Sequence, residues 1–438
     1  MLRSMFSAIS GLKAHQTKLD VAGNNIANVN TVGFKSSTTV FEDTLSQVLR
    51  NGSAPNGQTA GTNPAQVGLG VKVAGITTNF GQGSTQNTGR ASDFMISGDG
   101  FFVTQQGNQQ LYTRAGSFDL DGVGNLVTPD GATLLGWQAD AAGNIDANGG
   151  MVPLKVTQGQ VLAPVATSGA AVSGNLSASA AVGGPAVTSQ ITMFDGLGNA
   201  HQVSVTLVKK ANAAPAIPAT TTPPAPAVPA VLDTWTMTLA EGTNVLSSSD
   251  VTFDGTGATA GQINTPAGKS VTFTPSTLTT PSTAVTSWPG TVTLDLSALS
   301  QFGGASTAAA KTNAGSGSAL GTLESYSLSN DGTIVGLYSN GLRQPIGKLA
   351  LATFTNPGGL EKAGNSSYRA GDNSGNPLIG SAGTGGRGTL SAGALEMSNV
   401  DLAEEFTGLI VAQRGFQANS RVITTSDEIL QDLVQLKR

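Results

Sequence analysis

Few residues in this sequence have the side chains that acid–base, nucleophilic or metal chemistry requires, and those few are scattered. The two histidines, His15 and His201, lie in unrelated segments, and neither has a second histidine nearby at metal-site spacing. The sequence contains no cysteine, which excludes disulfides, thiolate metal ligands and cysteine nucleophiles. The sequence therefore disfavours a histidine metal centre and a Ser-His-Asp triad.

One stretch resembles a calcium-binding loop. In DLDGVGNLVTPD, Asp119, Asp121 and Asp130 occupy the first, third and twelfth positions. The fifth position, where a further ligand belongs, is Val123, and the flanking residues are typical of strands rather than of helices. We therefore interpret this stretch as a hairpin turn.

Two other patterns also point only weakly to a ligand or a modification. GTGGRG at residues 383–388 has the glycine spacing of a dinucleotide site, but it follows a loop, and the position about 20 residues later is Gly408 rather than an acid. We interpret it as a flexible connector. Asn175 and Asn365 match the glycosylation pattern, which is weak support by itself. We expect no catalytic, cofactor-binding or metal-binding residues, and hence no enzyme.

The composition limits the class of protein further. A chain of 438 residues is expected to form two or three domains. Charged residues are 11% of the chain, against about 25% in ordinary soluble domains, and there are 58 glycines. This composition favours turn-rich β structure over disorder, which is typically highly charged. A net charge of -5 gives no electrostatic reason to bind nucleic acid or an anionic membrane.

The N-terminal segment, MLRSMFSAISGLKAHQTKLD, is amphipathic and has neither a continuous apolar stretch nor an obvious cleavage site. No run of about 18 apolar residues occurs, which is the length a transmembrane helix needs. We therefore expect no secretory signal, no membrane insertion, and an export route without a cleaved signal if the protein leaves the cell.

Both ends of the chain have apolar residues at heptad spacing, which predicts helices that pack along their length. A second row, four residues after the first, becomes polar at Gln16, Gln413 and Ser420. Asp401, followed by Glu404, predicts an N-cap and a capping box at the start of the C-terminal helix. The residues expected to form the helix seam are Met5, Ile9, Leu12, Leu19, Ile26, Leu402, Phe406, Leu409, Phe416, Ile423 and Leu430.

Two interpretations of these rows are open. They can belong to an ordinary antiparallel helix pair that closes a domain. Alternatively, because a narrow seam buries little surface within one subunit, the helices can be completed by neighbouring molecules.

Between the ends, the sequence predicts two kinds of β segment. Residues 70–140 and 325–354 have short strands between turns such as Asp121-Gly122 and Asp331-Gly332. Residues 191–210 predict a hairpin around Asp195-Gly196 within a different block. A Pro/Ala/Thr tract at 211–231 is expected to be an exposed loop. Similar segments that flank a different block suggest an outer domain inserted into an inner one.

Three stretches resemble a known family. NNIANVNTVGFK is similar to the signature of the bacterial flagellar axial proteins of the rod and hook. ISGDGFF with YTRAGSFDLDGVGNLVTPDGATLLGW resembles their first globular domain, and NVDLAEEFTGLIVAQRGFQANSRVITTSDEILQDLVQLKR resembles their C-terminal helix. The signature residues are Asn24, Asn25, Ile26, Ala27, Asn28, Gly33, Phe34, Gln413, Arg414, Gln417, Ala418 and Asn419.

The resemblance implies a fold. It is an α+β multidomain chain of mainly antiparallel β domains nested one inside the other, with terminal helices that pair as a coiled coil. The expected bounds are 1–30 with 396–438 for the helices, 31–70 with 366–395 for an extended connector, 71–145 with 320–365 for the first β domain, and 146–319 for the inserted domain. Asn24, Asn25 and Asn28 are expected on the polar flank of the first helix, and Asn30 and Gly33 in left-handed conformations that end it.

The resemblance also implies a structural role without cofactors. Many copies would form the flexible helical tube of the hook, a universal joint that transmits torque from rod to filament. The implied partners are other copies of the chain, the distal rod protein, the hook cap protein, the hook–filament junction protein and the flagellar type III export apparatus. Length and the inserted block favour the hook members over a distal rod-type axial protein. A secreted β-rich adhesin or hydrolase is the alternative of a different class.

Overall fold

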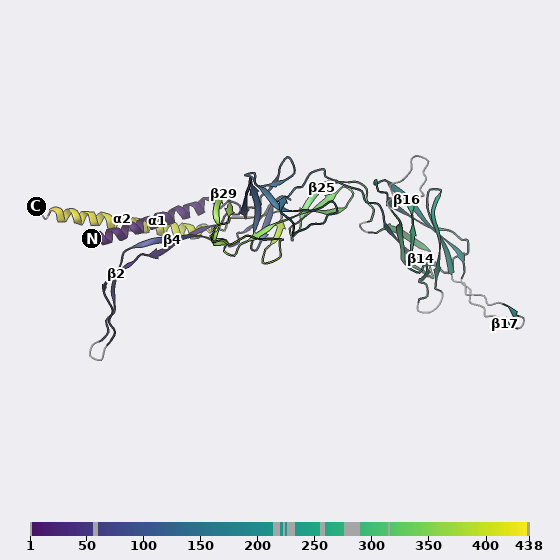
Figure 1. Ribbon diagram of the computed structural model, residues 1–438, viewed down its shortest axis with the longest axis horizontal. Helices are drawn as coiled ribbons and strands as arrows, with labels where there is room; N and C mark the ends of the chain where they lie inside the picture. The colour runs from purple at the N-terminus through teal and green to yellow at the C-terminus, as the bar shows by residue number, and fades with distance from the viewer. Residues whose placement is uncertain are drawn as a thin grey trace. The chain divides into compact units, whose positions relative to one another are not determined.

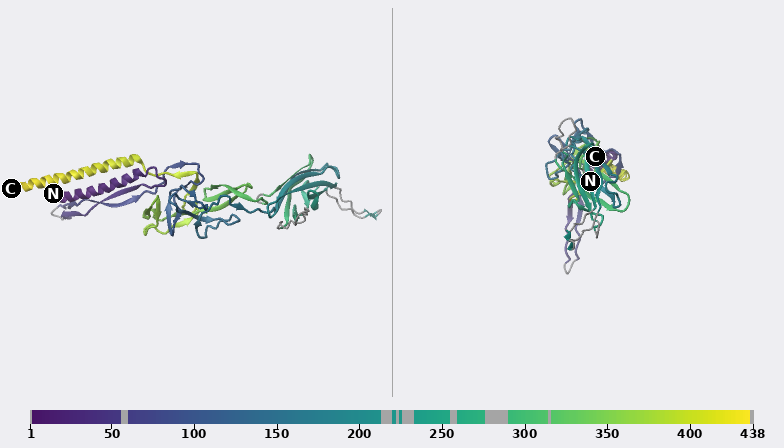
Figure 2. Two further views of the ribbon diagram at one scale, coloured as in Figure 1. Left: turned by 90° about the horizontal axis from the view of Figure 1, so that it is seen from above. Right: turned by 90° about the vertical axis from the view of Figure 1, so that its right-hand side faces the viewer.

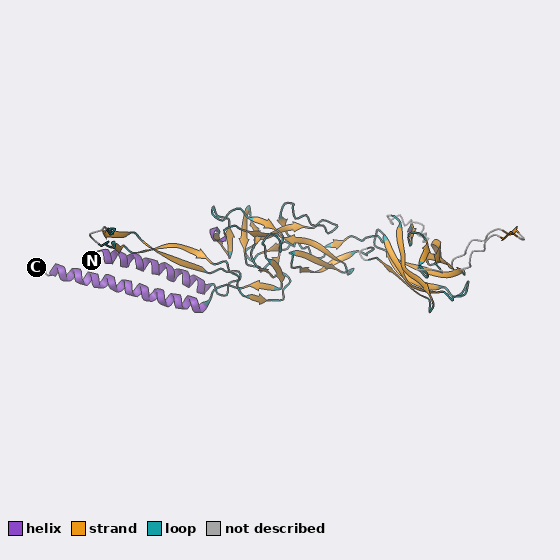
Figure 3. Ribbon diagram, turned by 90° about the horizontal axis from the view of Figure 1, so that it is seen from below, coloured by secondary structure: helices purple, strands orange, loops and turns teal. Residues whose placement is uncertain are grey.

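The computed structural model describes residues 2–55, 60–212, 220–221, 224–225, 233–254, 259–275, 290–313 and 316–435. These residues form two α-helices at the ends of the chain and mainly antiparallel strands between them (Figures 1 and 3), which confirms the predicted fold class. The chain divides into two compact units. Unit 1 comprises residues 1–158, 325–336 and 343–438, and unit 2 comprises residues 159–324 and 337–342.

The two helices of unit 1 pair with each other. Helix α1 is Leu2–Ala27 and helix α2 is Leu402–Gln435. Asp401 caps α2, because its Oδ1 accepts hydrogen bonds from the backbone N–H groups of Ala403 (2.8 Å) and Glu404 (3.3 Å), as predicted. The helices run side by side in Figure 1 and in the left view of Figure 2, with the N- and C-terminal ends of the chain at the same end of the pair.

A pair of long strands follows α1 and packs against it. Strand β1 (Ser37–Asp43) pairs antiparallel with β4 (Val71–Thr78), and both contact α1. Between them, β2 (Ser46–Arg50) pairs with β3 (Ala65–Gly68). The segment expected to be an extended connector at 31–70 therefore contains β1, which lies on the first helix, and the separate β2–β3 hairpin, which projects away from the helices in Figure 1.

The β body of unit 1 is built from both sides of unit 2. Its central strands are ordered β27-β11-β7-β8-β30-β29. Residues 366–395, expected as connector, contain strands that pair with this body. The strands are β5 (Thr85–Asn87), β6 (Phe94–Ser97), β7 (Phe101–Gln106), β8 (Gln109–Thr113), β9 (Asp119–Leu120), β10 (Leu126–Val127), β11 (Thr133–Gln138), β12 (Val152–Pro153), β27 (Arg343–Leu349), β28 (Leu351–Thr353), β29 (Glu361–Gly364), β30 (Ser367–Arg369), β31 (Leu378–Gly380), β32 (Thr389–Ala392) and β33 (Ala394–Glu396).

Aromatic side chains fill the core of this body. Phe101 meets Phe80, Phe354 and Tyr368 at ring-centroid distances of 5.5, 5.9 and 6.0 Å, all in edge-to-face geometry. Such pairs contribute about 0.5–1.5 kcal/mol beyond the area they bury. Because Phe354 and Tyr368 lie on the far side of unit 2 in sequence, this cluster joins the two halves of unit 1.

Unit 2 packs two sheets around one apolar core that includes Trp235, Met237 and Leu294. The sheets are ordered β15-β16-β19-β20-β21 and β22-β23-β14-β24. All of these pairs are antiparallel except β14 with β23, which is parallel. The strands are β13 (Val161–Leu162), β14 (Gly169–Ser177), β15 (Val187–Phe194), β16 (Ala200–Ala211), β19 (Asp233–Glu241), β20 (Asn244–Phe253), β21 (Ile263–Thr265), β22 (Ser270–Phe273), β23 (Val292–Phe302) and β24 (Thr307–Thr312).

Two strands, β25 (Gly321–Leu328) and β26 (Thr333–Tyr338), contain residues of both units. The inserted domain expected at 146–319 compares with a second unit that begins at Gly159 and ends at Glu324, with residues 337–342 added. The Pro/Ala-rich tract at 211–231 lies mostly outside the described residues. Within it, β17 (Thr220–Thr221) pairs with β18 (Pro224–Ala225).

The calcium-like stretch is a hairpin turn, as interpreted from the sequence. Strands β9 and β10 pair across it, and Asp121 Oδ1 accepts from the backbone N–H groups of Val123 and Asn125, both at 2.8 Å. The same Asp-x-x-Gly-Asn turn recurs at Asp140 and Asp195. Within the described residues, no group of three or more His, Asp or Glu side chains is placed to hold a metal ion.

Candidate assembly site

The helices approach each other closely because small residues lie between them. Ala8, Ala14 and Ala22 of α1 are almost fully buried, as is Ala412 of α2. A Cβ added at Gly11 would lie 2.8 Å from the Asn419 amide nitrogen, whereas Asn25, later in α1, bonds Glu405, earlier in α2, so the pair is antiparallel.

A histidine is enclosed in this seam. A Cβ added at Gly415 would lie 2.5 Å from His15 Nε2, and the other side of the imidazole meets the edge of Phe41 of β1 at 5.7 Å between centroids. Burial, followed by the nearby charge of Lys18, lowers the pKa of His15 below its usual value. The imidazole of His15 therefore fills the space beside Gly415, where a larger side chain on α2 would not fit.

The predicted first row of the seam follows this face, and the predicted second row does not. Leu12, Leu19, Leu409 and Phe416 are half-buried, as are Met5, Ile9, Ile26, Ile423 and Leu430. The second row of α2 lies three residues after each of these apolar residues rather than four, at Ala412, Asn419 and Ser426. The four-residue step is therefore wrong for α2, because Gln413 is exposed. Leu402 and Phe406, which were predicted for the seam, are also exposed, so their assignment to it is wrong.

Two further apolar rows of α2 remain exposed in the single chain. Leu402, Phe406 and Ile410 form one row at four-residue spacing and are 40, 50 and 55% exposed. Val411, Val422 and Ile429 form another on the opposite side of the seam and are 57, 42 and 44% exposed. Exposed apolar rows on both flanks of one helix are typical of a surface that other molecules cover.

The signature residue Asn25 lies at the base of the helix pair and is fully buried. Its Nδ2 donates to the Ser37 carbonyl (2.8 Å) and to Glu405 Oε1 of α2 (2.7 Å), and its Oδ1 accepts from the Ser37 N–H (3.0 Å). One amide thereby fixes α1, α2 and the start of β1 to each other. The prediction that Asn25 lies on a polar outer flank is wrong.

A buried ion cluster forms around Glu396, close to the end of α1. Lys35 and Glu396 have fully buried side chains with 2.6 Å between Nζ and Oε1, and Arg114 Nη1 lies 3.3 Å from Glu396 Oε2. Glu396 also accepts from the Gly83 N–H (2.9 Å), and Lys35 donates to the Gly81 carbonyl (2.8 Å). No pattern in the sequence indicates this cluster.

Burial shapes the charges of the cluster. Removal from water lowers the pKa of Lys35 and of Arg114, while Glu396 opposes both shifts. The paired carboxylate therefore favours the charged forms of both cations. Such an arrangement fixes geometry more than it adds stability, because the desolvation of the three charges is costly.

The helix exit depends on a glycine. Gly33 has φ of +67°, and a Cβ there would collide with the backbone of Arg114 and Ala115. Its N–H donates to the Glu396 carbonyl at 2.8 Å. The prediction of a left-handed Gly33 is confirmed. Asn30 does not have a positive φ, so that part of the prediction is wrong.

Asn399, just before α2, completes the polar base. Its Oδ1 accepts from the Ser36 N–H (2.8 Å), and its Nδ2 donates to the carbonyls of Asn79 (2.9 Å) and Gly81 (3.1 Å). Of the signature residues on α2, Asn419 faces the seam, whereas Gln413, Arg414, Gln417 and Ala418 are exposed. Ile26 and Asn28 are half-buried, and Asn24 and Ala27 are exposed.

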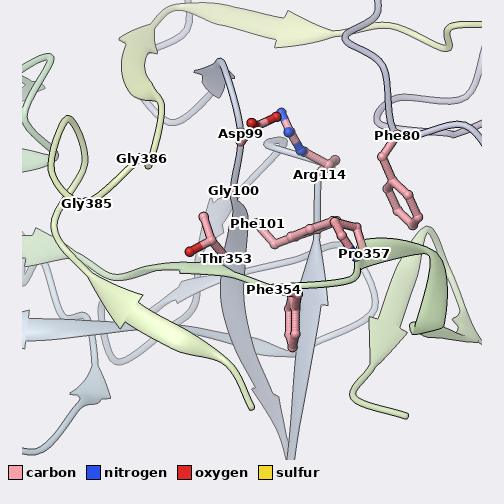
Figure 4. Close-up of a pocket in the computed structure, with 10 residues that line it drawn as sticks. All are labelled: Phe80, Asp99, Gly100, Phe101, Arg114, Thr353, Phe354, Pro357, Gly385 and Gly386. Carbon is pink, nitrogen blue, oxygen red and sulfur yellow. The ribbon is translucent and has the colours of Figure 1, made fainter. Parts of the chain in front are cut away.

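An aromatic cleft opens beside the ion cluster (Figure 4), with a volume of about 350 Å³. Phe80, Phe101 and Phe354 form walls, and Arg114 lies 5.5 Å from the Phe101 ring centroid. Because the Arg114 guanidinium already binds Glu396, it holds the strands together rather than poising a reaction. In the part of the chain that the structure describes, no helix is long and apolar enough to cross a membrane.

Four protein-family profiles match the chain. Residues 5–35 match "Flagella basal body rod protein", and residues 391–436 match "Flagellar basal body rod FlgEFG protein C-terminal". Residues 95–175 match "Flagellar hook protein FlgE/F/G D1 domain", and residues 185–316 match "Flagellar basal body protein FlaE D2 domain". The first two contain the helices described above, and the last lies in unit 2.

Curated relatives match over the whole length. The flagellar hook protein FlgE of Borreliella burgdorferi is 38% identical and that of Salmonella typhimurium is 37% identical, with 100% and 99% of this chain covered and 100% of each relative. The flagellar basal-body rod protein FlgG of Bacillus subtilis is 31% identical over 100% of both chains, so length alone does not separate hook from rod members.

Among solved structures, the flagellar hook protein FlgE2 of Helicobacter pylori has the same fold, with a TM-score of 0.51 over 70% of this chain and 98% of that chain, at 13% identity. The family consists of structural proteins rather than enzymes. The full-length identity to several hook proteins shows that the chain belongs to the flagellar hook protein family.

Proposed function

We propose that many copies of this chain polymerise into the flexible helical tube of the flagellar hook, which acts as a universal joint between rod and filament. The observation that supports this most directly is the pair of exposed apolar rows on opposite flanks of α2, from Leu402 to Ile410 and from Val411 to Ile429. A single neighbour covers one flank, whereas a helix in the wall of a tube has neighbours on both. Head-to-tail contacts of this kind generate open helical assemblies.

The proposal includes the other components that a hook requires. The chain would pass unfolded through the flagellar type III export apparatus without a cleaved signal and assemble outside the cell. It would meet the distal rod protein at one end, the hook–filament junction protein at the other, and the hook cap protein during growth. The absence of cysteine suits a chain that must be exported unfolded.

Bending requires that contacts between neighbouring outer domains exchange at low energy. Only 11% of the residues are charged, so few ion pairs are available to fix one register of contacts. Replacing surface residues of unit 2 with opposed charges should therefore change the curvature or stiffness of the tube. Unchanged curvature and stiffness would contradict this part of the proposal.

The experiment is complementation of a flagellated strain that lacks its own copy of the gene. Negative-stain microscopy of the deletion strain should show basal bodies without hook or filament, and the wild-type chain should restore both. A chain truncated after Val400 should restore neither, because α2 is lost. Hooks in the deletion strain, or tubes formed without α2, would contradict the proposal. An adhesin or hydrolase would instead retain its activity as a monomer with both helices removed.

A further inference from the structure

A polar cleft beside the end of α1 has no role in the helix pair. It has a volume of about 400 Å³, and its lining includes Asn24, Asn28, Phe34, Lys362 and Ser366. We call it the Lys362 cleft. Three of its residues, Asn24, Asn28 and Phe34, belong to the signature, and Asn28 Nδ2 donates to the Asn24 carbonyl (2.9 Å). The two amides thus form one wall, and the turn between β29 and β30 forms another.

The cleft contains a cation that lacks a counterion. Lys362 Nζ donates to Ser37 Oγ at 2.9 Å and lies 5.5 Å from the Phe34 ring centroid. Among the ion pairs of the described residues, none includes Lys362. Although much of the side chain is exposed, partial burial of the ammonium lowers the pKa of Lys362. A carboxylate that entered the cleft would offset this desolvation.

Carboxylates lie near the opposite end of the helix pair. Asp427, Glu428 and Asp432 belong to the last turns of α2, and in the sequence they lie between Arg421 and the terminal Lys437 and Arg438. Glu428 and Asp432 are exposed and lie one turn apart on the same face of α2. Because Gly11 faces Asn419 and α1 begins at Leu2, the last turns of α2 extend beyond the start of α1.

These two features cannot meet within one chain. Glu405 of α2 lies level with Asn25, next to the cleft. Glu428 follows 23 residues later in the same helix, which places it about 35 Å away along the axis. In a head-to-tail assembly, by contrast, opposite ends of successive helix pairs come together.

We propose that the exposed carboxylates of Glu428 and Asp432, in the last turns of α2, insert into the Lys362 cleft of the next copy along the tube. The inference rests on the proposed function, because it requires polymerisation. It assigns the amide-lined cleft beside the signature to recognition between copies. It also explains why a partly desolvated ammonium has a hydroxyl and an aromatic ring as its partners within the single chain.

The test measures seeded growth of the purified full-length protein on hook fragments. At equilibrium, Lys362→Glu should raise the concentration of unpolymerised protein about tenfold, the change expected for a lost charge contact of ordinary strength. Glu428→Lys with Asp432→Lys should do the same. The chain that combines all three changes should return toward the wild-type value, because the charges are exchanged. The control Lys155→Glu changes net charge equally at an exposed site outside the cleft and should have no effect.

The outcomes separate the two proposals. A wild-type protein that cannot elongate seeds contradicts hook polymerisation itself. Three results would overturn the cleft assignment alone, provided that the wild-type protein grows. They are unchanged growth of Lys362→Glu, an equal growth defect in Lys155→Glu, and no recovery of growth when the charges are exchanged. Far-UV circular dichroism melts show whether each variant folds. If Lys362→Glu does not fold, Asn24→Asp places a carboxylate in the cleft from an exposed position and should weaken growth similarly.

Discussion

Replacing Glu396 with glutamine should destabilise the base of the helix pair more than any other single change in the ion cluster. Glu396 is the only anion of the cluster and is fully buried between Lys35 (2.6 Å) and Arg114 (3.3 Å). Glutamine has the same shape and can still accept a hydrogen bond from Gly83. It removes the charge that compensates two cations, which leaves Lys35 buried without a counterion and Arg114 with only the smaller attraction of Asp99.

The expected magnitude follows from that geometry. Removing one partner of a buried ion pair typically costs about 3–5 kcal/mol. Lys35→Met should cost less, about 1–3 kcal/mol, because Glu396 keeps Arg114 and the Gly83 N–H. In the double variant the two losses should not add, since the second change removes a cation that the first had left unpaired. A coupling energy of about 1–3 kcal/mol is expected.

Urea unfolding followed by circular dichroism at 222 nm suits this test, because both α-helices of the described residues belong to unit 1. Lys348→Gln is the matched control, since Lys348 pairs at 3.0 Å with Asp331, whose side chain is 54% exposed. That change should cost at most about 1 kcal/mol. If Glu396→Gln unfolds within about 1 kcal/mol of the wild type, or costs no more than Lys348→Gln, the cluster does not hold the base together.

Three further predictions concern other parts of unit 1. Burial raises the pKa of Tyr368 to about 12, so the contribution of its protonated hydroxyl to folding stability is present below about pH 10 and is lost as pH rises toward 12. Tyr368→Phe should therefore reduce the loss of unfolding free energy in that window by up to about 2–3 kcal/mol, measured by urea titration at each pH. Gly415→Ala should lower the melting temperature of the helices, because the new Cβ would lie 2.5 Å from the His15 imidazole. Gly408→Ala, which has open space around it, should instead stabilise the helices by up to about 1 kcal/mol, and equal effects of the two changes would refute close packing at the seam. Asn25→Ala should cost about 1–3 kcal/mol, and Asn25→Asp should cost more, because it would place a second carboxylate beside Glu405; the reverse order in urea unfolding would show that the amide does not bridge the helices.

The periodic features of the fold could be predicted from the sequence because periodicity is local. The heptad rows gave the helices, Asp401 gave the start of α2, and Asp-Gly pairs gave hairpin turns such as that at Asp195. The second row of the seam was misplaced for a physical reason. Helix geometry permits a step of three or four residues. A step of four residues from Leu402 leads to the large apolar Phe406, which is exposed. A step of three from Leu409 leads to Ala412, whose small side chain is buried between the closely packed helices.

The polar base could not be predicted, because its members are distant in sequence. Lys35 and Glu396 are separated by 361 residues, and nothing beside Glu396 in ALEMS marks it as the partner of a lysine. Asn25 was misassigned to the surface because asparagine is usually exposed. A buried asparagine is explained only when its partners are known, and here these come from β1 and α2.

Polar contacts at the base of the helix pair fix the arrangement within one chain, whereas the apolar rows of α2 would make the contacts between chains. Asn25 and Glu396 make directional, buried contacts that allow one arrangement of α1, α2 and β1 within the chain. The rows from Leu402 to Ile429 are apolar and non-directional, so contacts made through them can shift by small steps without losing a hydrogen bond. A joint built this way would bend between copies rather than within the helix base of one copy. Variants that weaken the base should therefore reduce the number of hooks, and variants in the exposed rows should change how the hook bends.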